Sequence, residues 1–219
     1  MATTSLHRDY TSGEEIANSV THGAGAALSL AAIVALILFS GNYQDPWRSV
    51  GFSIYGSTLF ILYLASTLYH AWPHHKLKAF FRLMDHASIF LLIAGTYTPI
   101  TLIAMRGPWG WTLFGIIWTL AIGGVIFKLL FMGRFKAVSL ALYAAMGWLA
   151  VIAIKPMLVL LPEGLLAWII AGGLLYTLGI GFYVWKKLPY HHAIWHLFVL
   201  GGSLLHFFGI LLHLSQKPI

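Results

Sequence analysis

The 219-residue sequence contains no cysteine. This absence excludes disulfide bonds, thiolate ligands for a metal and any chemistry that needs a thiol. Charge is also scarce, because only 9% of the residues are Asp, Glu, Lys or Arg, against roughly 25% in an average soluble domain. Since 59% of the residues are hydrophobic, such a chain is not water-soluble. We therefore expect one integral membrane domain over residues 1–219 and no separate soluble module.

Negative charge is the scarcer of the two signs. Six acidic residues stand against thirteen Lys and Arg, which gives a formal net charge of +7 and an isoelectric point near 9.7. A basic chain can bind nucleic acid, but here the basic residues gather in short loops between hydrophobic runs. That distribution is typical of the cytoplasmic side of a membrane protein, where it attracts anionic lipid headgroups. The sequence thus predicts membrane lipids as partners and no nucleic acid.

Seven hydrophobic runs are long enough to cross a bilayer, which needs about 20 apolar residues per helix. They cover, approximately, residues 20–40, 48–70, 83–105, 109–131, 137–155, 164–185 and 192–214. The prediction is an all-α membrane protein, a bundle of seven transmembrane helices, with no cleavable signal peptide. Two runs carry local breakers. Pro99 should kink the third run, and Gly147 with the following Lys155-Pro156 should shorten the fifth.

The distribution of Lys and Arg also predicts the orientation of the bundle. With the N-terminus inside, nine basic residues lie on the inner side: Arg8, Lys76, Lys78, Arg82, Lys128, Arg134, Lys136, Lys186 and Lys187. Four lie on the outer side: Arg48, Arg106, Lys155 and Lys217. We therefore predict a cytoplasmic N-terminus and an external C-terminus, in the plasma membrane (the inner membrane of a bacterium).

Four titratable residues gather where this topology brings three spans together. His70 closes the second span, Asp85 lies in the first turns of the third, and His192 and His196 lie in the first turns of the seventh. Positions i and i+4 share a helix face, so His192 and His196 can point at one atom. Titratable side chains inside membrane spans are costly and usually mark a functional site. All four are expected near the inner face.

Three neutral imidazoles and one open position form the ligand set of a catalytic zinc site. Iron, nickel and copper also bind imidazole, so ligand type alone leaves the metal open. We predict His70, His192 and His196 as metal ligands, with Asp85 as a catalytic residue that orients or deprotonates a water. Ser66, a second catalytic candidate, lies one turn before His70 on the same face. Its hydroxyl either reaches the open position or bonds the carbonyl four residues earlier in its own helix.

Simpler interpretations stand beside the metal hypothesis. A histidine at a helix end is commonly an interfacial side chain, and buried histidines also serve as hydrogen-bonding groups. In the N-terminal segment, Ser12 and Glu15 fit a capping box. Glu15, Asn18 and His22 also share one helix face, from which they could close the metal cavity or lock helices together. His206, in mid-span, should face the bundle and either line a cavity or bond a facing carbonyl.

Taken together, these motifs resemble the progestin and adipoQ receptor superfamily, and most of all its bacterial hemolysin III branch. The motifs are Glu-x-x-Asn-x-x-x-His at 15–22, Ser-x-x-x-His at 66–70, Asp85 and His-x-x-x-His at 192–196. The resemblance covers essentially the whole chain. It implies a zinc ion near the cytoplasmic face held by the three histidines, with Asp85 and Ser66 at its open position. It also implies kinship with the adiponectin receptors and with the alkaline ceramidases, which cleave lipid amides. Where the receptors carry serine, this chain has His191, an alternative ligand.

Three functions compete at this stage. The first is a zinc-dependent hydrolase of lipid amides or esters, which should have a cavity open sideways to lipid. The second is a non-enzymatic sensor or regulator of membrane state, in which structural zinc ties the second, third and seventh spans together. The third is a pore-forming cytolysin, which the sequence disfavours because its polar residues gather at one membrane face instead of lining a channel.

Overall fold

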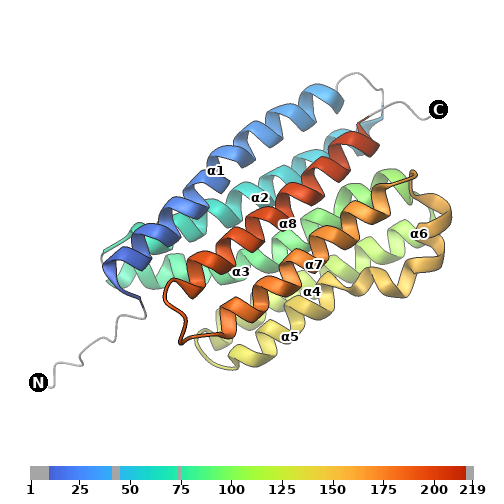
Figure 1. Cartoon of the computed structure of the whole chain (residues 1–219). Coiled ribbons are helices and arrows are strands. Elements are labelled where there is room, and N and C mark those ends of the chain that lie inside the picture. The colour runs from blue at the N-terminus through green and yellow to red at the C-terminus, as the bar shows by residue number, and fades with distance from the viewer. Residues whose placement is uncertain (1–9, 41–44, 74, 216–219) are drawn as a thin grey trace, which may run out of the picture.

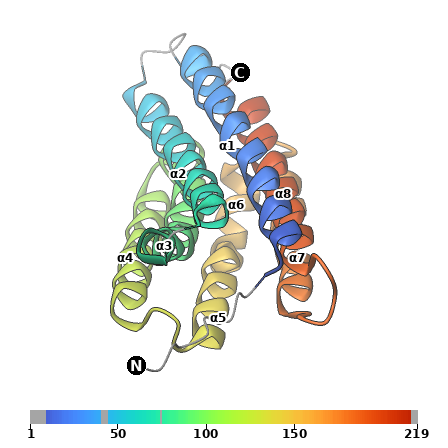
Figure 2. The same cartoon turned by 90° about the vertical axis from the view of Figure 1, so that its left-hand side faces the viewer.

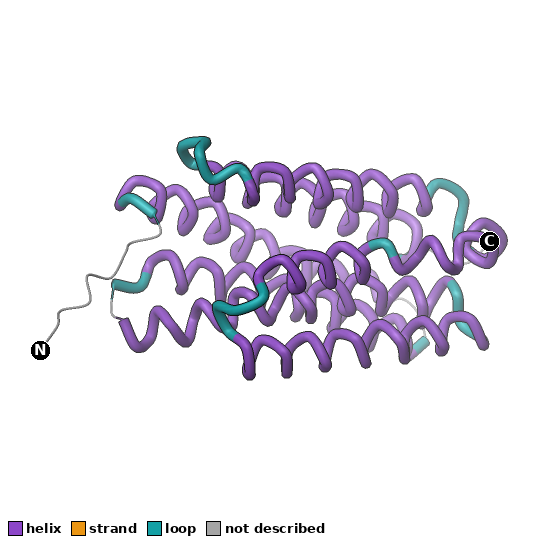
Figure 3. Tube along the Cα trace, turned by 90° about the horizontal axis from the view of Figure 1, so that it is seen from below, coloured by secondary structure: helices purple, strands orange, loops and turns teal. Residues whose placement is uncertain are grey.

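The computed structural model describes residues 10–40, 45–73 and 75–215. Across these ranges the chain is helical and contains no strand, and short loops join the helices (Figure 3). Seven of its helical segments are long and apolar enough to cross a membrane. The predicted all-α bundle of seven spans is therefore confirmed.

Consecutive spans run antiparallel to one another along the length of the bundle (Figure 1). Two of them are built from more than one helical piece. In chain order the elements are α1 (Ser12–Ser40), α2 (Pro46–Ala71), α3 (His75–Pro99), a π-helical turn (Ile100–Ala104), α4 (Pro108–Phe131), α5 (Lys136–Gly147), a 3₁₀ turn (Leu149–Ala153), α6 (Ile154–Leu160), α7 (Leu165–Val184) and α8 (His191–Leu214).

One end of the bundle carries the candidate residues. The helices α1, α3, α5 and α8 begin there, and α2, α4 and α7 finish there. We call it the histidine end, because His70, His192 and His196 lie at it. That this end faces the cytoplasm remains a prediction. Two of the basic residues that support this prediction, Arg8 and Lys217, lie outside the described residues.

The first and third spans begin earlier than their hydrophobic runs predict. Helix α1 begins at Ser12 and α3 at His75, so each adds a polar stretch to its apolar run. In α1 this stretch contains Glu14 and Glu15, and in α3 it contains Lys78. Hydropathy reports the part of a helix that lies in hydrocarbon, whereas backbone hydrogen bonds continue into the polar interface. The added turns are important because they carry residues of the candidate site.

The start of α1 corrects one predicted detail. The capping box uses Thr11 and Glu14, one residue earlier than the Ser12–Glu15 pair. The Thr11 backbone N donates to Glu14 Oε2 at 2.8 Å, and the Glu14 backbone N donates to Thr11 Oγ1 at 3.2 Å. Glu15 is unavailable for capping because its carboxylate faces other helices.

Both predicted breakers act locally, and one prediction about them is wrong. Helix α3 ends at Pro99 and continues as a π turn, consistent with a proline that cannot donate to the helix ladder. The fifth span does not end at Lys155-Pro156. It changes to a 3₁₀ turn after Gly147 and then continues in α6 to Leu160. Pro156 is tolerated there because it lies in the first turn of α6, where its missing N–H has no helical partner to lose.

Helix α1 packs against both α2 and α8 (Figure 2), so the first and last spans are neighbours. Small residues allow this close approach. A Cβ on Gly25 would lie 2.5 Å from the Tyr63 ring, too close for any side chain. Tyr63 is buried, and its hydroxyl donates to Ser203 Oγ at 2.7 Å. The contact therefore links α1, α2 and α8 beneath the candidate site.

At the opposite end, Asp45 precedes α2 and caps it, accepting from the Trp47 backbone N at 3.2 Å. Its carboxylate also accepts a hydrogen bond from Arg106 and lies 3.9 Å from Arg48 Nε. Burial by itself would raise the pKa of Asp45. The hydrogen bonds from Arg106 and Trp47, with the charges of Arg106 and Arg48, outweigh burial and lower that pKa below its ordinary value of 3.8.

We predict that Asp45→Asn destabilises the protein in a pH-dependent way. A carboxyl whose pKa is lowered by folding stabilises the folded state above its ordinary pKa, and the contribution is lost as the pH falls through the folded value. Asparagine keeps the cap but removes the charge. Thermal unfolding in detergent should show a deficit of up to about 1 kcal/mol at pH 7 that closes as the pH falls below the ordinary carboxyl pKa of 3.8. An equal deficit at both pH values would contradict the prediction.

Candidate metal centre

Three histidines from two helices meet at the histidine end. His70 lies in the last turn of α2, and His192 and His196 lie one turn apart at the start of α8. One ring nitrogen of each lies within 4.8 Å of the others. All three side chains are buried, and His196 is fully enclosed. The structure therefore brings together the three residues that the sequence proposes as ligands, and they could hold a metal ion.

Four buried ring nitrogens of this cluster have no hydrogen-bond partner. They are His70 Nε2, His196 Nε2 and both nitrogens of His192. A buried polar atom that makes no hydrogen bond costs about 1–3 kcal/mol, so several in one place indicate a group that would satisfy them together. Imidazole nitrogen suits zinc, and three such ligands leave a coordination position open. The donor set therefore fits a zinc ion.

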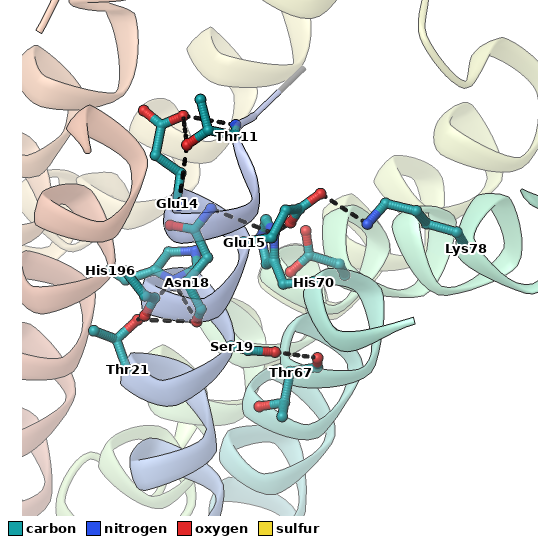
Figure 4. A network of polar contacts seen from close by, with 12 residues as sticks. Thr11, Glu14, Glu15, Asn18, Ser19, Thr21, Thr67, His70, Lys78 and His196 are labelled. Atoms are coloured by element: carbon teal, nitrogen blue, oxygen red, sulfur yellow. Dashed lines mark hydrogen bonds and ion pairs between the residues drawn. The ribbon is translucent and has the colours of Figure 1, made fainter. Parts of the chain in front are cut away.

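The far side of His70 is held by a carboxylate. Its Nδ1 lies 2.6 Å from Glu15 Oε2, and the other oxygen of Glu15 accepts from Lys78 Nζ at 2.8 Å (Figure 4). The Asn18 amide nitrogen also approaches His70 Nδ1, but at the longer distance of 3.4 Å. Since the closer partner is a carboxylate, which only accepts hydrogen bonds when ionised, we assign the His70 proton to Nδ1 and the lone pair to Nε2. A carboxylate behind a histidine is a common means of orienting a metal ligand. The chain Lys78–Glu15–His70 joins α3, α1 and α2.

The far side of His196 is held by α1. Its Nδ1 lies 3.2 Å from the Asn18 carbonyl oxygen and 3.1 Å from Thr21 Oγ1 (Figure 4). The Thr21 hydroxyl donates its own proton to the carbonyls of Ala17 and Asn18. Both groups can therefore only accept from His196, which places its proton on Nδ1 and its lone pair on Nε2. Two of the three histidines are thus fixed in the tautomer that a metal needs.

Two aromatic rings enclose the cluster. The ring of His22 stacks on that of His196 with 3.4 Å between centroids and 12° between planes. On the other side, the ring of Tyr10, just before α1, lies 4.9 Å from that of His192 and 5.8 Å from that of His70. The Glu15–Asn18–His22 face of α1 therefore packs directly against the histidines.

Ser66 and Asp85, the predicted catalytic residues, are both buried. Ser66 Oγ has no hydrogen-bond partner, so the alternative in which it bonds its own helix carbonyl is wrong. Asp85 does not join the histidine cluster among the described residues. Its Oδ2 instead lies 3.4 Å from Nδ1 of the adjacent His86. The third span therefore reaches the cluster through Lys78 and Glu15, and no described contact of Asp85 ties it there.

Sequence reasoning missed three residues around the cluster. Thr21 follows Asn18 by three positions, a spacing that could have suggested a shared contact. Lys78 counted only as a basic loop residue, because α3 was expected to begin after it. Tyr10 precedes every predicted span. His191, an alternative ligand, is buried nearby but lies outside the cluster.

A cavity of about 150 Å³ lies toward the opposite half of the bundle, lined mainly by apolar residues of α6, α7 and the π and 3₁₀ turns. His206 lines it and also bonds the Ile169 carbonyl through Nε2 at 3.0 Å. Both predicted roles of His206 are therefore present. None of the three clustered histidines lines this cavity.

Comparisons with known proteins agree on one family. The family model described as haemolysin-III related matches residues 10–207. Hemolysin-3 of Bacillus cereus is 52% identical over 91% of this chain and 91% of its own length. The Hemolysin-3 homolog of Bacillus subtilis (strain 168) is 47% identical over 95% of this chain and 98% of its own. Human monocyte to macrophage differentiation factor is 32% identical over 94% of this chain and 86% of its own length. No solved structure matches the chain.

We predict that Glu15→Gln weakens binding of Zn²⁺ about tenfold or more, because loss of a carboxylate behind a metal-binding histidine typically costs 10–100-fold in affinity. Competition with a zinc chelator in detergent measures the change. Glu14→Gln is the matched control, since Glu14 bonds Thr11 and the Tyr190 backbone N and not a histidine. Equal zinc affinities in the two variants would count against the orienting role of Glu15.

Proposed function

Because the chain belongs to the haemolysin-III related family and is a multi-pass membrane protein, we propose that it holds a zinc ion and acts on membrane lipids. The ligands would be His70, His192 and His196. The reaction that this centre suits best is hydrolysis of a lipid amide or ester. A bacterial inner membrane is consistent with the two Bacillus relatives.

One observation carries this proposal. Buried imidazole nitrogens converge with no partner, while the opposite nitrogens of His70 and His196 are hydrogen-bonded. Histidines that served only to bond helices together would be expected to use their inner nitrogens as well. The arrangement instead leaves one unpaired nitrogen of each histidine within 4.8 Å of the others, which supports a metal centre.

The residues around the centre have distinct roles in this proposal. Bound zinc would supply a Lewis acid that polarises a carbonyl oxygen and activates water near neutral pH. Ser66, whose hydroxyl is buried and free, would hydrogen-bond the substrate beside His70. Asp85 would accept a proton from the attacking water after a change of rotamer away from His86. Tyr10 would limit entry of bulk water from the histidine end.

We predict about one zinc per chain in detergent-purified protein, measured by plasma mass spectrometry. The His192→Ala/His196→Ala double variant should lose it, because a single remaining imidazole cannot hold the ion. A His206→Ala variant is the matched control, since His206 lies outside the cluster. Folded protein without metal, after purification in zinc-supplemented buffer, would contradict the proposal.

A second candidate function has its own observation in favour. The ligands lie on α2 and α8, and α1 holds two of them from behind, so zinc would link the first, second and last spans. The protein could then be a non-enzymatic regulator or sensor of membrane state with structural zinc. This linkage differs from the expected tie between the second, third and seventh spans, because Asp85 is absent from the cluster.

Asp85→Asn distinguishes the two functions. If the protein is a hydrolase, this variant should keep its zinc and lose turnover of lipid amides by about a hundredfold or more, as expected on removal of a general base. If zinc is structural, wild type should release no lipid product and should lose thermal stability when zinc is chelated. Mass spectrometry of lipids after incubation with ceramide-type amides provides the readout. Full turnover without zinc would end the hydrolase proposal.

The name of the Bacillus cereus relative suggests a third function, membrane lysis. A lytic pore would need polar side chains along its whole length. Here the three clustered histidines lie at the histidine end, and the cavity toward the opposite half is lined mainly by apolar side chains. Of the three candidate functions, a lytic pore therefore has the least support.

A further inference from the structure

A second group of charged residues lies at the histidine end, away from the three histidines. Arg82 is in α3, Lys128 is in the last turn of α4 and Lys136 begins α5. Lys128 is only 3% exposed. The Nε atom of Arg82 is buried and has no hydrogen-bond partner. Two cationic side chains are therefore enclosed, wholly or in part, between helices.

No described acid neutralises these cations. None of the three basic residues forms an ion pair with a described acid. Four of the described acids have the partners given above, and the fifth lies in the α6–α7 loop at the opposite end. The five are Glu14, Glu15, Asp45, Asp85 and Glu163. The sixth acid of the chain, Asp9, lies outside the described residues.

The Lys128 ammonium lies over an aromatic ring. Lys128 Nζ lies 5.9 Å from the centre of the Tyr143 ring. The Tyr143 hydroxyl is used elsewhere, donating to the His86 carbonyl at 2.7 Å. A cation–π contact is weaker than a charge-assisted hydrogen bond. A lysine with a largely buried side chain therefore has no anion beside it among the described residues, an arrangement that is costly in a membrane protein.

The charges of this group act on one another. Contacts among the described residues connect them: the Tyr143 ring that lies under Lys128 also bonds His86 through its hydroxyl, and His86 Nδ1 lies 2.8 Å from the Arg82 carbonyl oxygen. Lys136 adds its positive charge to that of Lys128. Asp85 is the one described acid in the group, and its carboxylate lies against His86. The group therefore contains three cations and one carboxylate, so its net charge is positive.

We propose that Arg82, Lys128 and Lys136 form a binding site for a phosphate group, at the ends of α3, α4 and α5. Arginine and lysine are the usual donors to phosphate oxygens. Basic pockets between transmembrane helices are known binding sites for anionic headgroups. The phosphate comes either from an anionic phospholipid or from free inorganic phosphate. The site is independent of the metal centre and does not rest on the hydrolase proposal.

The test measures binding of phosphatidylglycerol to the full chain by native mass spectrometry, with phosphatidylcholine as the neutral comparison. Lys128→Met keeps the aliphatic bulk and removes the charge, and Arg82→Gln removes the second cation. Each should weaken phosphatidylglycerol binding about fivefold or more, because each basic residue near an anionic surface contributes that order of affinity. Lys128→Arg should retain binding. Lys187→Met, an exposed lysine at the same end, should leave it unchanged.

Sodium phosphate distinguishes the two sources. If it displaces the lipid from wild type, the site takes the phosphate group alone; if not, it takes the lipid with its acyl chains. Unchanged phosphatidylglycerol binding in both Lys128→Met and Arg82→Gln would overturn the site. Thermal unfolding checks that each variant folds. If Lys128→Met fails to fold, lipid binding by Arg82→Gln alone tests the site. The zinc content of all variants should equal that of wild type, which separates this test from that of the metal centre.

Discussion

Polar groups buried in this bundle must find their partners inside the protein, because the surrounding hydrocarbon offers none. Most of them do so with the nearest carbonyl, as Thr98 does with Ala94. The exceptions define the functional regions. At the histidine end, the carboxylate of Glu15 satisfies the outer nitrogen of His70 and the ammonium of Lys78 at once. This leaves the other ring nitrogen of His70 without a partner. His196 is arranged in the same way, because its Nδ1 bonds the Asn18 carbonyl and its Nε2 has no partner.

Much of this could be predicted from the sequence. Hydropathy locates seven spans because each must cross the same thickness of hydrocarbon. Helical spacing then places His192 and His196 on one face, and the alternation of spans brings His70 to them. Where the spans begin was predicted less well. The polar starts of α1 and α3 lie beyond the hydrocarbon, so hydropathy does not detect the turns that carry Glu15 and Lys78.

The position of Asp85 shows a second limit. Span order places it at the correct end, but the direction of a side chain depends on its rotamer and neighbours, which spacing does not encode. Its nearest described partner is the adjacent His86. Likewise, the sequence shows Lys128 as one of several basic residues near a loop. Its burial, and the lack of a described acid beside it, follow only from the packing of α4 against its neighbours.

The contact between the first and last spans has a consequence for biosynthesis. Asn18 and Thr21 reach His196 across 178 and 175 positions of the chain. Two of the three clustered histidines are on α8, the last helix that the structure describes. A nascent chain therefore carries Glu15 and His70 into the membrane long before their partners arrive. Until α8 is inserted, α1 and α2 hold one histidine and its carboxylate without the other two histidines. Assembly of the histidine cluster thus requires that all seven described spans be inserted with α1 and α8 side by side.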